Sequence, residues 1–145
     1  MKIYLVRHGK ALPPEIDPEK GLSPEGKTEA EKIARHLAEK SFPIETIYHS
    51  EKLRAKQTAE IFKECIAPHA PLVLLHQMNP NDPIDEVIAH IEASDGDCMF
   101  VGHLPFMNAV CTHLKVGEVR FDAATCACLE TENGKWKLAW VVRDC

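Results

Sequence analysis

Long apolar runs and an excess of basic residues are both missing from this 145-residue sequence. The first apolar run spans only residues 3–6 before Arg7, too short for the core of a signal peptide, and no later stretch approaches the length of a membrane span. The formal net charge of -5 argues against nucleic-acid binding, which usually requires a basic surface. We therefore expect a cytoplasmic protein with neither a membrane nor a nucleic acid as its partner.

Internal repeats, low-complexity tracts and linker-like stretches are also missing. Hydrophobic residues make up 45% of the chain and charged residues 27%, and both values are typical of globular proteins. A chain of this length can bury enough apolar surface to build a hydrophobic core of its own. The sequence therefore predicts a single domain over residues 1–145.

Cysteine is present six times, but its spacing suggests neither a disulfide framework nor a metal site. In a reducing compartment we expect free thiols, most of them buried. The one close pair is Cys126 and Cys128, and zinc sites favour two to four residues between such ligands rather than one. Because side chains alternate along a strand, this spacing instead predicts two thiols on one face of a strand.

Strands and helices alternate through the first two-thirds of the chain. Short apolar stretches predict four strands, at residues 2–6, 44–48, 72–75 and 98–101. Three segments have the features of a helix start: Ser23 before Pro24, Ser50, and Asp82 before Pro83. A further helix is expected over residues 106–114. This alternation predicts a mainly parallel sheet with helices on both faces, that is, a three-layer α/β/α sandwich.

The end of the chain follows a different pattern. Three more strands are predicted, at residues 119–121, 125–129 and 136–142. Asn133 and Gly134 form a typical hairpin-turn dipeptide between the last two of them. We therefore expect at least one antiparallel pair of strands in this part of the chain.

Arginine and histidine side chains follow three of the predicted parallel strands. Arg7 and His8 come after the first strand, Arg54 lies in the first turn of the helix after the second, and His103 follows the fourth. In open parallel sheets, ligands bind beyond the carboxyl ends of the strands, where helix N-termini add partial positive charge. The planar guanidinium of arginine matches the oxygens of a phosphate. The sequence therefore predicts an anion site here, which a carboxylate ligand would also fit.

The histidines indicate chemistry as well as binding. A histidine can attack phosphorus when one ring nitrogen is unprotonated, and nearby arginines disfavour the charged imidazolium. The other ring nitrogen of His8 should donate to a backbone carbonyl, which would fix the tautomer. Gly9 has no side chain, so the backbone can bend closely around the site. We therefore expect His8 to reach a bound phosphoryl group.

Four motifs occur in a fixed order along nearly the whole chain: RHG at 7–9, LSPEG at 22–26, SEKLRAKQTAE at 50–60 and VGHLP at 101–105. Together they resemble the histidine phosphatase (phosphoglycerate mutase-like) superfamily, and their spacing is most similar to that of the SixA-type phosphohistidine phosphatases. The resemblance implies that His8 is the nucleophile, that Arg7 and Arg54 hold the phosphoryl oxygens, and that His103 stabilises the transferring group. It implies neither a metal nor another cofactor, because the arginines supply the positive charge.

The sequence departs from this family pattern at the proton donor. Many relatives carry a carboxylic acid either directly after the second histidine or after the third strand, but here those places hold Leu104 and the stretch 76–80, which contains no carboxylate. Asp17, Asp82 and Asp85 remain as candidate substitutes. General acid catalysis contributes about 10²–10⁴-fold for an alkoxide leaving group, whereas phosphohistidine has an easier leaving group. The departure therefore favours phosphohistidine as the substrate.

The resemblance thus implies a phosphatase that removes phosphate from phosphohistidine in a partner protein of the histidine-phosphotransfer type. One alternative is a small-molecule phosphomonoesterase of the same superfamily, acting on a phosphorylated metabolite, which a candidate carboxylate at the site would support. Another is a phosphate- or phosphoprotein-binding module without turnover, although Arg7, His8, Arg54 and His103 together argue against it. Mutase activity is disfavoured because the chain lacks the long insertion that closes over the substrate in the mutases.

Overall fold

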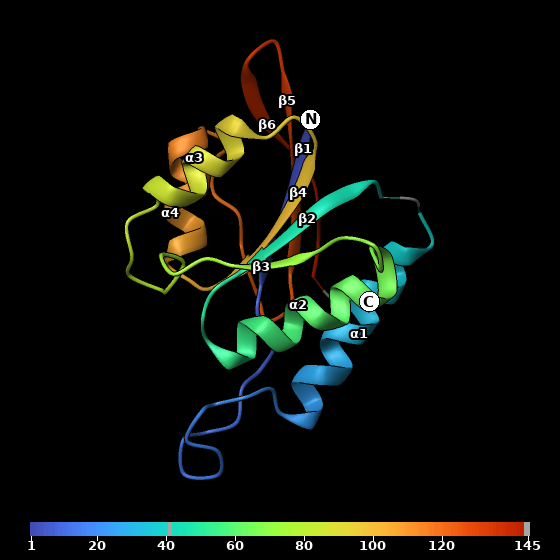
Figure 1. Ribbon diagram of the computed structural model, residues 1–145, viewed down its shortest axis with the longest axis vertical. Coiled ribbons are helices and arrows are strands. Elements are labelled where there is room, and N and C mark those ends of the chain that lie inside the picture. The colour runs from blue at the N-terminus through green and yellow to red at the C-terminus, as the bar shows by residue number, and fades with distance from the viewer. Residues whose placement is uncertain (41, 144–145) are drawn as a thin grey trace.

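A single six-stranded sheet organises the protein, with the strand order β3-β2-β4-β1-β5-β6 (Figure 1). The computed structural model describes residues 1–40 and 42–143. In chain order the elements are β1 (Lys2–Arg7), α1 (Pro24–Ala38), β2 (Ile44–His49), α2 (Leu53–Ile66), β3 (Leu72–Leu74), α3 (Asp85–Ala93), β4 (Asp97–Gly102), α4 (Phe106–Leu114), β5 (Cys126–Glu132) and β6 (Lys135–Val142). The predicted alternation of strands and helices is confirmed.

The sheet has a parallel and an antiparallel part. Strands β3, β2, β4 and β1 pair in parallel. Strand β5 pairs with β1 and β6 in antiparallel fashion, and β5 and β6 form the hairpin at the top of Figure 1. Both the mainly parallel sheet and the antiparallel pair at its C-terminal side are therefore as predicted. No helix within the described residues is both long and apolar enough for a membrane crossing.

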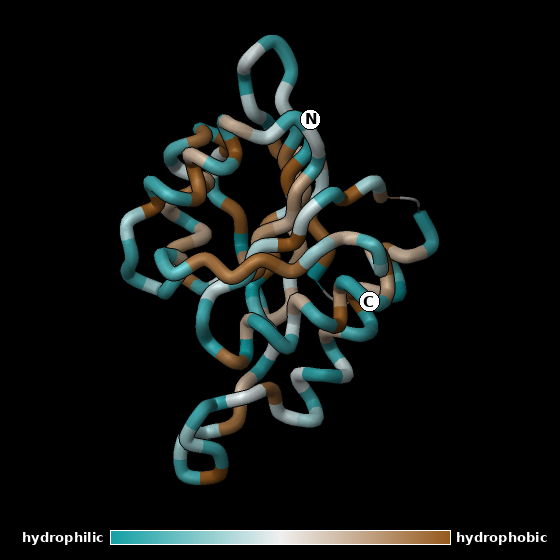
Figure 2. Tube along the Cα trace, viewed as in Figure 1, coloured by the Kyte–Doolittle hydropathy of each residue, from teal (hydrophilic) through white to brown (hydrophobic). Residues whose placement is uncertain are grey.

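Each face of the sheet carries its own hydrophobic core, because side chains alternate along every strand. On β1, Tyr4 and Val6 pack into the core that includes α1 and α2, whereas Ile3 and Leu5 pack into the core that includes α3 and α4. The helices therefore lie as pairs on opposite sides of the sheet (Figure 1), and hydrophobic residues concentrate along the strands between them (Figure 2). The three-layer α/β/α architecture is confirmed.

The cysteine interpretation is also confirmed where the structure describes the thiols. Cys126 and Cys128 both lie in the core beneath α1 and α2, as expected for two positions on one face of a strand. The described cysteines are all free thiols. Cys65 is half-buried, and the other four are buried: Cys98, Cys111, Cys126 and Cys128. Cys145 lies outside the described residues. Burial raises the pKa of the Cys111 thiol to about 11, so that thiol is un-ionised at neutral pH.

One predicted helix start is confirmed and two are wrong. Ser23 caps α1, because its hydroxyl accepts the backbone N–H of Gly26. Helix α2 begins at Leu53, two residues later than a cap at Ser50 would require. Its N-cap residue is Lys52, whose side chain makes no capping hydrogen bond. Helix α3 begins at Asp85, because the Asp82 carboxylate accepts the backbone N–H of Asn79 in a turn that precedes the helix. A short polar side chain satisfies either kind of backbone N–H, so its identity alone does not distinguish a helix cap from a turn.

The strand predicted at residues 119–121 is also wrong. These residues have no regular secondary structure, although Val119 and Phe121 are buried. The Phe121 carbonyl oxygen accepts a hydrogen bond from the Arg7 side chain rather than from a neighbouring strand. The alternating apolar side chains therefore predicted burial correctly. They did not predict a strand correctly, because the backbone groups here do not pair with a neighbouring strand.

Candidate active site

The segments that follow β1, β2 and β4 meet at one edge of the sheet. The backbone N–H of His8 donates to the Gly102 carbonyl over 3.0 Å, and that of Ser50 donates to the Val101 carbonyl over 3.3 Å. These bonds continue the strand pairing beyond the ends of the strands. The side chains of His8, Ser50 and His103 are therefore carried on three adjacent segments with a fixed register.

The segment after β1 is held in place by contacts to both α1 and α2. The Gly9 N–H donates to Thr58 Oγ1 over 3.0 Å, and the Thr58 hydroxyl donates to the Arg54 carbonyl over 2.8 Å. A Cβ atom on Gly9 would lie only 2.9 Å from the Gly26 carbonyl oxygen. Gly9 therefore permits a close backbone approach, as expected from the sequence, and the approach is toward the start of α1.

The glycine of the LSPEG motif has the reciprocal role. A Cβ atom on Gly26 would overlap the carbonyl oxygen of Lys10, so only glycine fits at this position without a backbone shift. The same Lys10 carbonyl accepts the Ser23 backbone N–H over 2.9 Å. The start of α1 thus clamps the chain that leads away from His8. Sequence reasoning noted this motif but assigned no role to Gly26 or to Thr58.

His8 presents one unprotonated ring nitrogen. Its Nδ1 lies 2.6 Å from the Gly9 carbonyl oxygen, which can only accept, so Nδ1 carries the proton and Nε2 carries the lone pair. Burial lowers the pKa of His8 to about 4, and the charges of Arg54 and Arg7 add to this effect, while the bond to Gly9 opposes it. The ring is therefore uncharged at neutral pH. Burial contributes more than the arginines that the sequence suggested as the cause.

His103 lies beside His8 and is almost fully buried. The two ring centroids are 4.9 Å apart, and His103 exposes 1% of its surface. Burial lowers the pKa of His103 to about 3, followed by the effects of His8 and Arg54. Its Nε2 lies 2.6 Å from Ser50 Oγ. Its Nδ1 is buried and has no hydrogen-bond partner among residues 1–40 and 42–143.

The two arginines predicted from the sequence lie with these histidines. Arg7 donates from Nη1 to the Phe121 carbonyl over 2.8 Å, and its buried Nε has no partner within the described part of the chain. Arg54 occupies the first turn of α2, as expected. Both guanidinium groups lower the pKa of both His8 and His103, which reflects how closely the four side chains gather. Two cations and an unpaired buried donor beside an uncharged imidazole suit an anionic ligand that the imidazole could attack.

The candidate proton donors have other, local interactions. Asp17 accepts the backbone N–H groups of Glu19 and Gly21 within its own loop. Asp82 is bound to Asn79, and Asp85 lies in the first turn of α3, where an acidic side chain complements the helix dipole. None of these contacts places a carboxyl group beside His8.

Sequence reasoning missed one carboxylate near the site, that of Glu51, which directly follows Ser50. It accepts from Asn79 Nδ2 over 2.8 Å and lies 3.3 Å from His76 Nδ1. The hydrogen bonds from Asn79 and then His76 lower the pKa of Glu51, so the carboxyl group is ionised at neutral pH and is a poor proton donor. Within the described residues, no cluster of three or more His, Cys, Asp or Glu side chains is suited to hold a metal ion.

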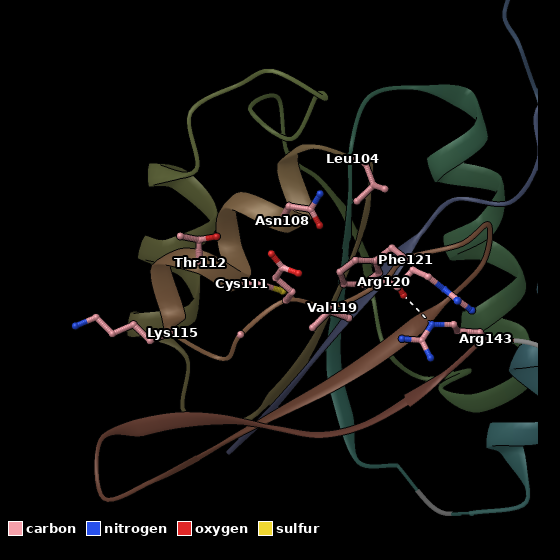
Figure 3. Close-up of a pocket in the computed structure, with 11 residues that line it drawn as sticks. Leu104, Asn108, Cys111, Thr112, Lys115, Val119, Arg120, Phe121 and Arg143 are labelled. Carbon is pink, nitrogen blue, oxygen red and sulfur yellow. Dashed lines mark hydrogen bonds between the residues drawn. The ribbon is translucent and has the colours of Figure 1, made fainter.

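A cavity of about 930 Å³ lies close to His103 and Arg7 (Figure 3). One wall is α4 with the preceding Leu104, which directly follows His103, and the other is the segment up to Phe121, whose carbonyl holds Arg7. The charged side chains that line it are Lys115, Glu118, Arg120 and Arg143. The cavity thus lies along α4 and adjoins the site through Leu104 and Phe121, although none of the four site residues lines it, and its charged lining is mainly basic.

Solved structures of similar shape define the fold as phosphoglycerate mutase-like. The protein histidine phosphatase SixA complexed with tungstate superposes with a TM-score of 0.88 at 23% identity, covering 99% of this chain and 97% of the other. The SixA protein from Agrobacterium tumefaciens superposes with a TM-score of 0.82 at 27% identity, covering 97% and 96%.

Sequence comparison then gives the family. The model of the histidine phosphatase superfamily (branch 1) matches residues 3–78. The phosphohistidine phosphatase SixA of Escherichia coli K12 is 26% identical over 153 residues, which cover 100% of this chain and 95% of SixA. The chain belongs to the histidine phosphatase superfamily, branch 1, and the resemblance drawn from its four motifs is confirmed.

Proposed function

We propose that this protein is a phosphatase in which His8 accepts a phosphoryl group from a phosphohistidine residue of another protein. The observation that carries the proposal is the geometry of His8. Its Nδ1 proton is committed to the Gly9 carbonyl, so the lone pair on Nε2 is available beside Arg7, Arg54 and His103. Family membership and the similarity to the SixA proteins support phosphatase chemistry.

The proposed reaction has two steps. In the first, His8 Nε2 attacks phosphorus, the phosphorus–nitrogen bond of the substrate breaks, and the departing imidazole takes a proton from solvent. In the second, water attacks the phosphorus of phospho-His8 and releases inorganic phosphate and the free imidazole. Arg7 and Arg54 stabilise the charge on the phosphoryl oxygens throughout. We propose that these arginines replace a metal ion, so turnover should persist in EDTA.

The proton inventory of the site supports phosphohistidine as the substrate. The carboxylate next to the site, Glu51, is held ionised by Asn79 and His76. A site that lacks a proton donor handles a phosphoramidate better than an alkyl phosphate, because the alkoxide of the latter needs a proton as it leaves. The sequence led to the same expectation through Leu104 and residues 76–80.

The surroundings of the site support a substrate presented by a protein. The cavity along α4 is large enough for side chains of a partner, and Lys115, Arg120 and Arg143 outnumber Glu118 in its lining. Away from this cavity, the segment between β1 and α1 projects beyond the sheet (Figure 1). This segment carries Ile16, which is 69% exposed. Partner contacts around a catalytic centre commonly combine an exposed apolar side chain with charged neighbours.

The test is phosphate release from a histidine-phosphotransfer protein phosphorylated on histidine and from a panel of small phosphate monoesters, for the wild type and His8→Ala. We expect turnover of the phosphoprotein that survives EDTA and is lost in the variant. Stronger turnover of alkyl monoesters would favour the small-molecule phosphatase instead. Binding of phosphate or vanadate without any turnover would show a recognition module and would overturn the proposal.

A further inference from the structure

Ser50 is a fully buried hydroxyl at the centre of the site, although the sequence suggested only a helix cap for it. It exposes none of its surface and directly follows β2, next to the segment that carries His103, which separates it from the segment that carries His8. Its Oγ is 2.6 Å from His103 Nε2 and 3.3 Å from the backbone nitrogen of Lys52. We propose that Ser50 is a positioning residue that holds His103 in the tautomer with its proton on Nδ1.

The position of the proton follows from the partners of the hydroxyl group. The Lys52 N–H is a donor, so Ser50 Oγ must accept from it and keeps its own proton for another bond. Among residues 1–40 and 42–143, His103 Nε2 is the one acceptor within reach of that proton. The hydroxyl oxygen has a second lone pair, but if it also accepted from Nε2, the proton of the fully buried Ser50 would have no partner among these residues, which is unfavourable. Ser50 therefore donates to Nε2, which carries the lone pair. In an uncharged imidazole the remaining proton then lies on Nδ1.

The other nitrogen of His103 shows what this tautomer offers to a ligand. Nδ1 is buried and has no partner in the described part of the chain, although an unpaired buried donor is unfavourable. With its proton fixed there, Nδ1 is a hydrogen-bond donor beside His8 that a phosphoryl oxygen can satisfy. If Ser50 accepted instead, Nδ1 would present a lone pair to the anion and repel it.

Ser50 thereby gives the two histidines opposite roles. The Gly9 carbonyl fixes the proton of His8 on Nδ1 and leaves Nε2 as the nucleophile, while the Ser50 hydroxyl fixes the lone pair of His103 on Nε2 and leaves Nδ1 as a donor. The inference rests on the proposed function for the identity of the acceptor, which is the transferring phosphoryl group. The tautomer itself can be measured without any substrate.

The first measurement is ¹⁵N NMR of the imidazole nitrogens in the wild-type protein at neutral pH. His103→Gln identifies the His103 signals, because they disappear from its spectrum. We expect His103 to carry its proton on Nδ1. A proton on Nε2 would overturn the inference, and this result does not depend on whether a serine variant folds or on whether the protein turns over any substrate.

The second measurement compares Ser50→Ala with Ser94→Ala, which removes the hydroxyl of a half-buried serine at the opposite end of the sheet. We expect Ser50→Ala to convert the single tautomer of His103 into a mixture and to lower kcat on a phosphohistidine protein about three- to tenfold, the effect of one hydrogen bond. Ser94→Ala should change neither. An unchanged tautomer in Ser50→Ala would overturn the inference, whereas the expected tautomers in a wild type that hydrolyses nothing would refute only the proposed function.

Discussion

The segments after β1 and β4 each begin with a histidine, yet the two side chains are held by different means. His8 is half-buried, and its segment is clamped by Thr58 and by the close approach of Gly26. His103 is almost fully buried and has one side-chain partner, the Ser50 hydroxyl. A backbone carbonyl orients the first ring and a hydroxyl orients the second.

This comparison shows that a single neighbouring atom decides what a histidine can do. A carbonyl oxygen can only accept, so it leaves the far nitrogen of His8 without a proton. A buried hydroxyl whose proton has no other acceptor among the described residues donates to the ring, so it leaves the far nitrogen of His103 with a proton. Burial and the same pair of arginines lower the pKa of both rings, so electrostatics alone does not distinguish them.

The largest expected effect on turnover comes from replacing the imidazole of His8 or of His103. His8→Gln should lower turnover of phosphohistidine by about 10⁴-fold or more, because no nucleophile remains. His103→Gln should lower it by about 10²–10³-fold, the typical cost of one donor to a developing negative charge. Phosphate release and acid-labile ³²P labelling of the enzyme check this. Equal losses in both variants, with labelling absent from both, would contradict different roles for the two rings.

The clamp on the His8 segment can be loosened from outside the site. Gly26→Ala introduces a Cβ where the Lys10 carbonyl lies, so the segment after His8 must shift. We expect the free energy of unfolding to fall by about 1–3 kcal/mol, as for other overpacked sites. Urea unfolding measures it, and Lys27→Ala at the exposed neighbouring position should change the free energy by less than about 0.5 kcal/mol. Equal stability of the two variants would rule out a tight clamp.

Acid should destabilise the fold through both rings. The folded pKa values of about 4 for His8 and about 3 for His103 lie below the ordinary value of 6.5, so the unfolded chain binds protons first as the pH falls. Stability is therefore lost between pH 6.5 and about 3. Urea midpoints at pH 7 and pH 5 should differ less in His103→Gln than in the wild type, whereas His113→Gln, at an exposed position on α4, should behave like the wild type. An unchanged pH dependence in His103→Gln would contradict the lowered pKa.

The smallest effect is expected outside both histidine segments, in the cavity along α4. Lys115→Glu reverses one charge of its mainly basic lining. We expect the KM for a phosphohistidine protein to rise a few-fold, as for other charges at the edge of an interface, with no change for a small aryl phosphate. Lys135→Glu, at the exposed start of β6, is the matched control. An equal response to both substrates would show that the cavity does not contact a protein partner.

The sequence was sufficient to place the candidate site residues at the ends of predicted strands and helices, but not to predict the contacts between distant segments. Apolar periodicity located the parallel strands, and the rule that ligands bind at the carboxyl ends of such strands grouped four residues at one edge of the sheet: Arg7, His8, Arg54 and His103. The location of each of these residues in the fold follows from its distance in the sequence to the end of a strand or the start of a helix. Local pattern is enough for that kind of prediction.

The roles of Ser50 and Gly26 could not be predicted because they depend on segments distant in the chain. A serine just before a helix is most simply a cap, and only the approach of β4 shows that its partner is His103. A glycine in the first turn of a helix has no evident purpose until the backbone of Lys10 lies against it. The same limit applies to residues 119–121, where burial was predicted but the Arg7 side chain takes the Phe121 carbonyl.

The position of β1 in the sheet has a consequence for biosynthesis. This first strand pairs with β4 on one side and β5 on the other, both of which are made late in translation. Contacts between such distant segments form slowly, because a long stretch of chain must be ordered to bring them together. A ribosome-bound chain that ends before β4 already contains His8, Arg7 and Arg54 but lacks the strand that brings His103 beside them. Phosphatase activity should therefore emerge only when β4 and β5 have left the ribosome, which makes it a direct reporter of sheet assembly.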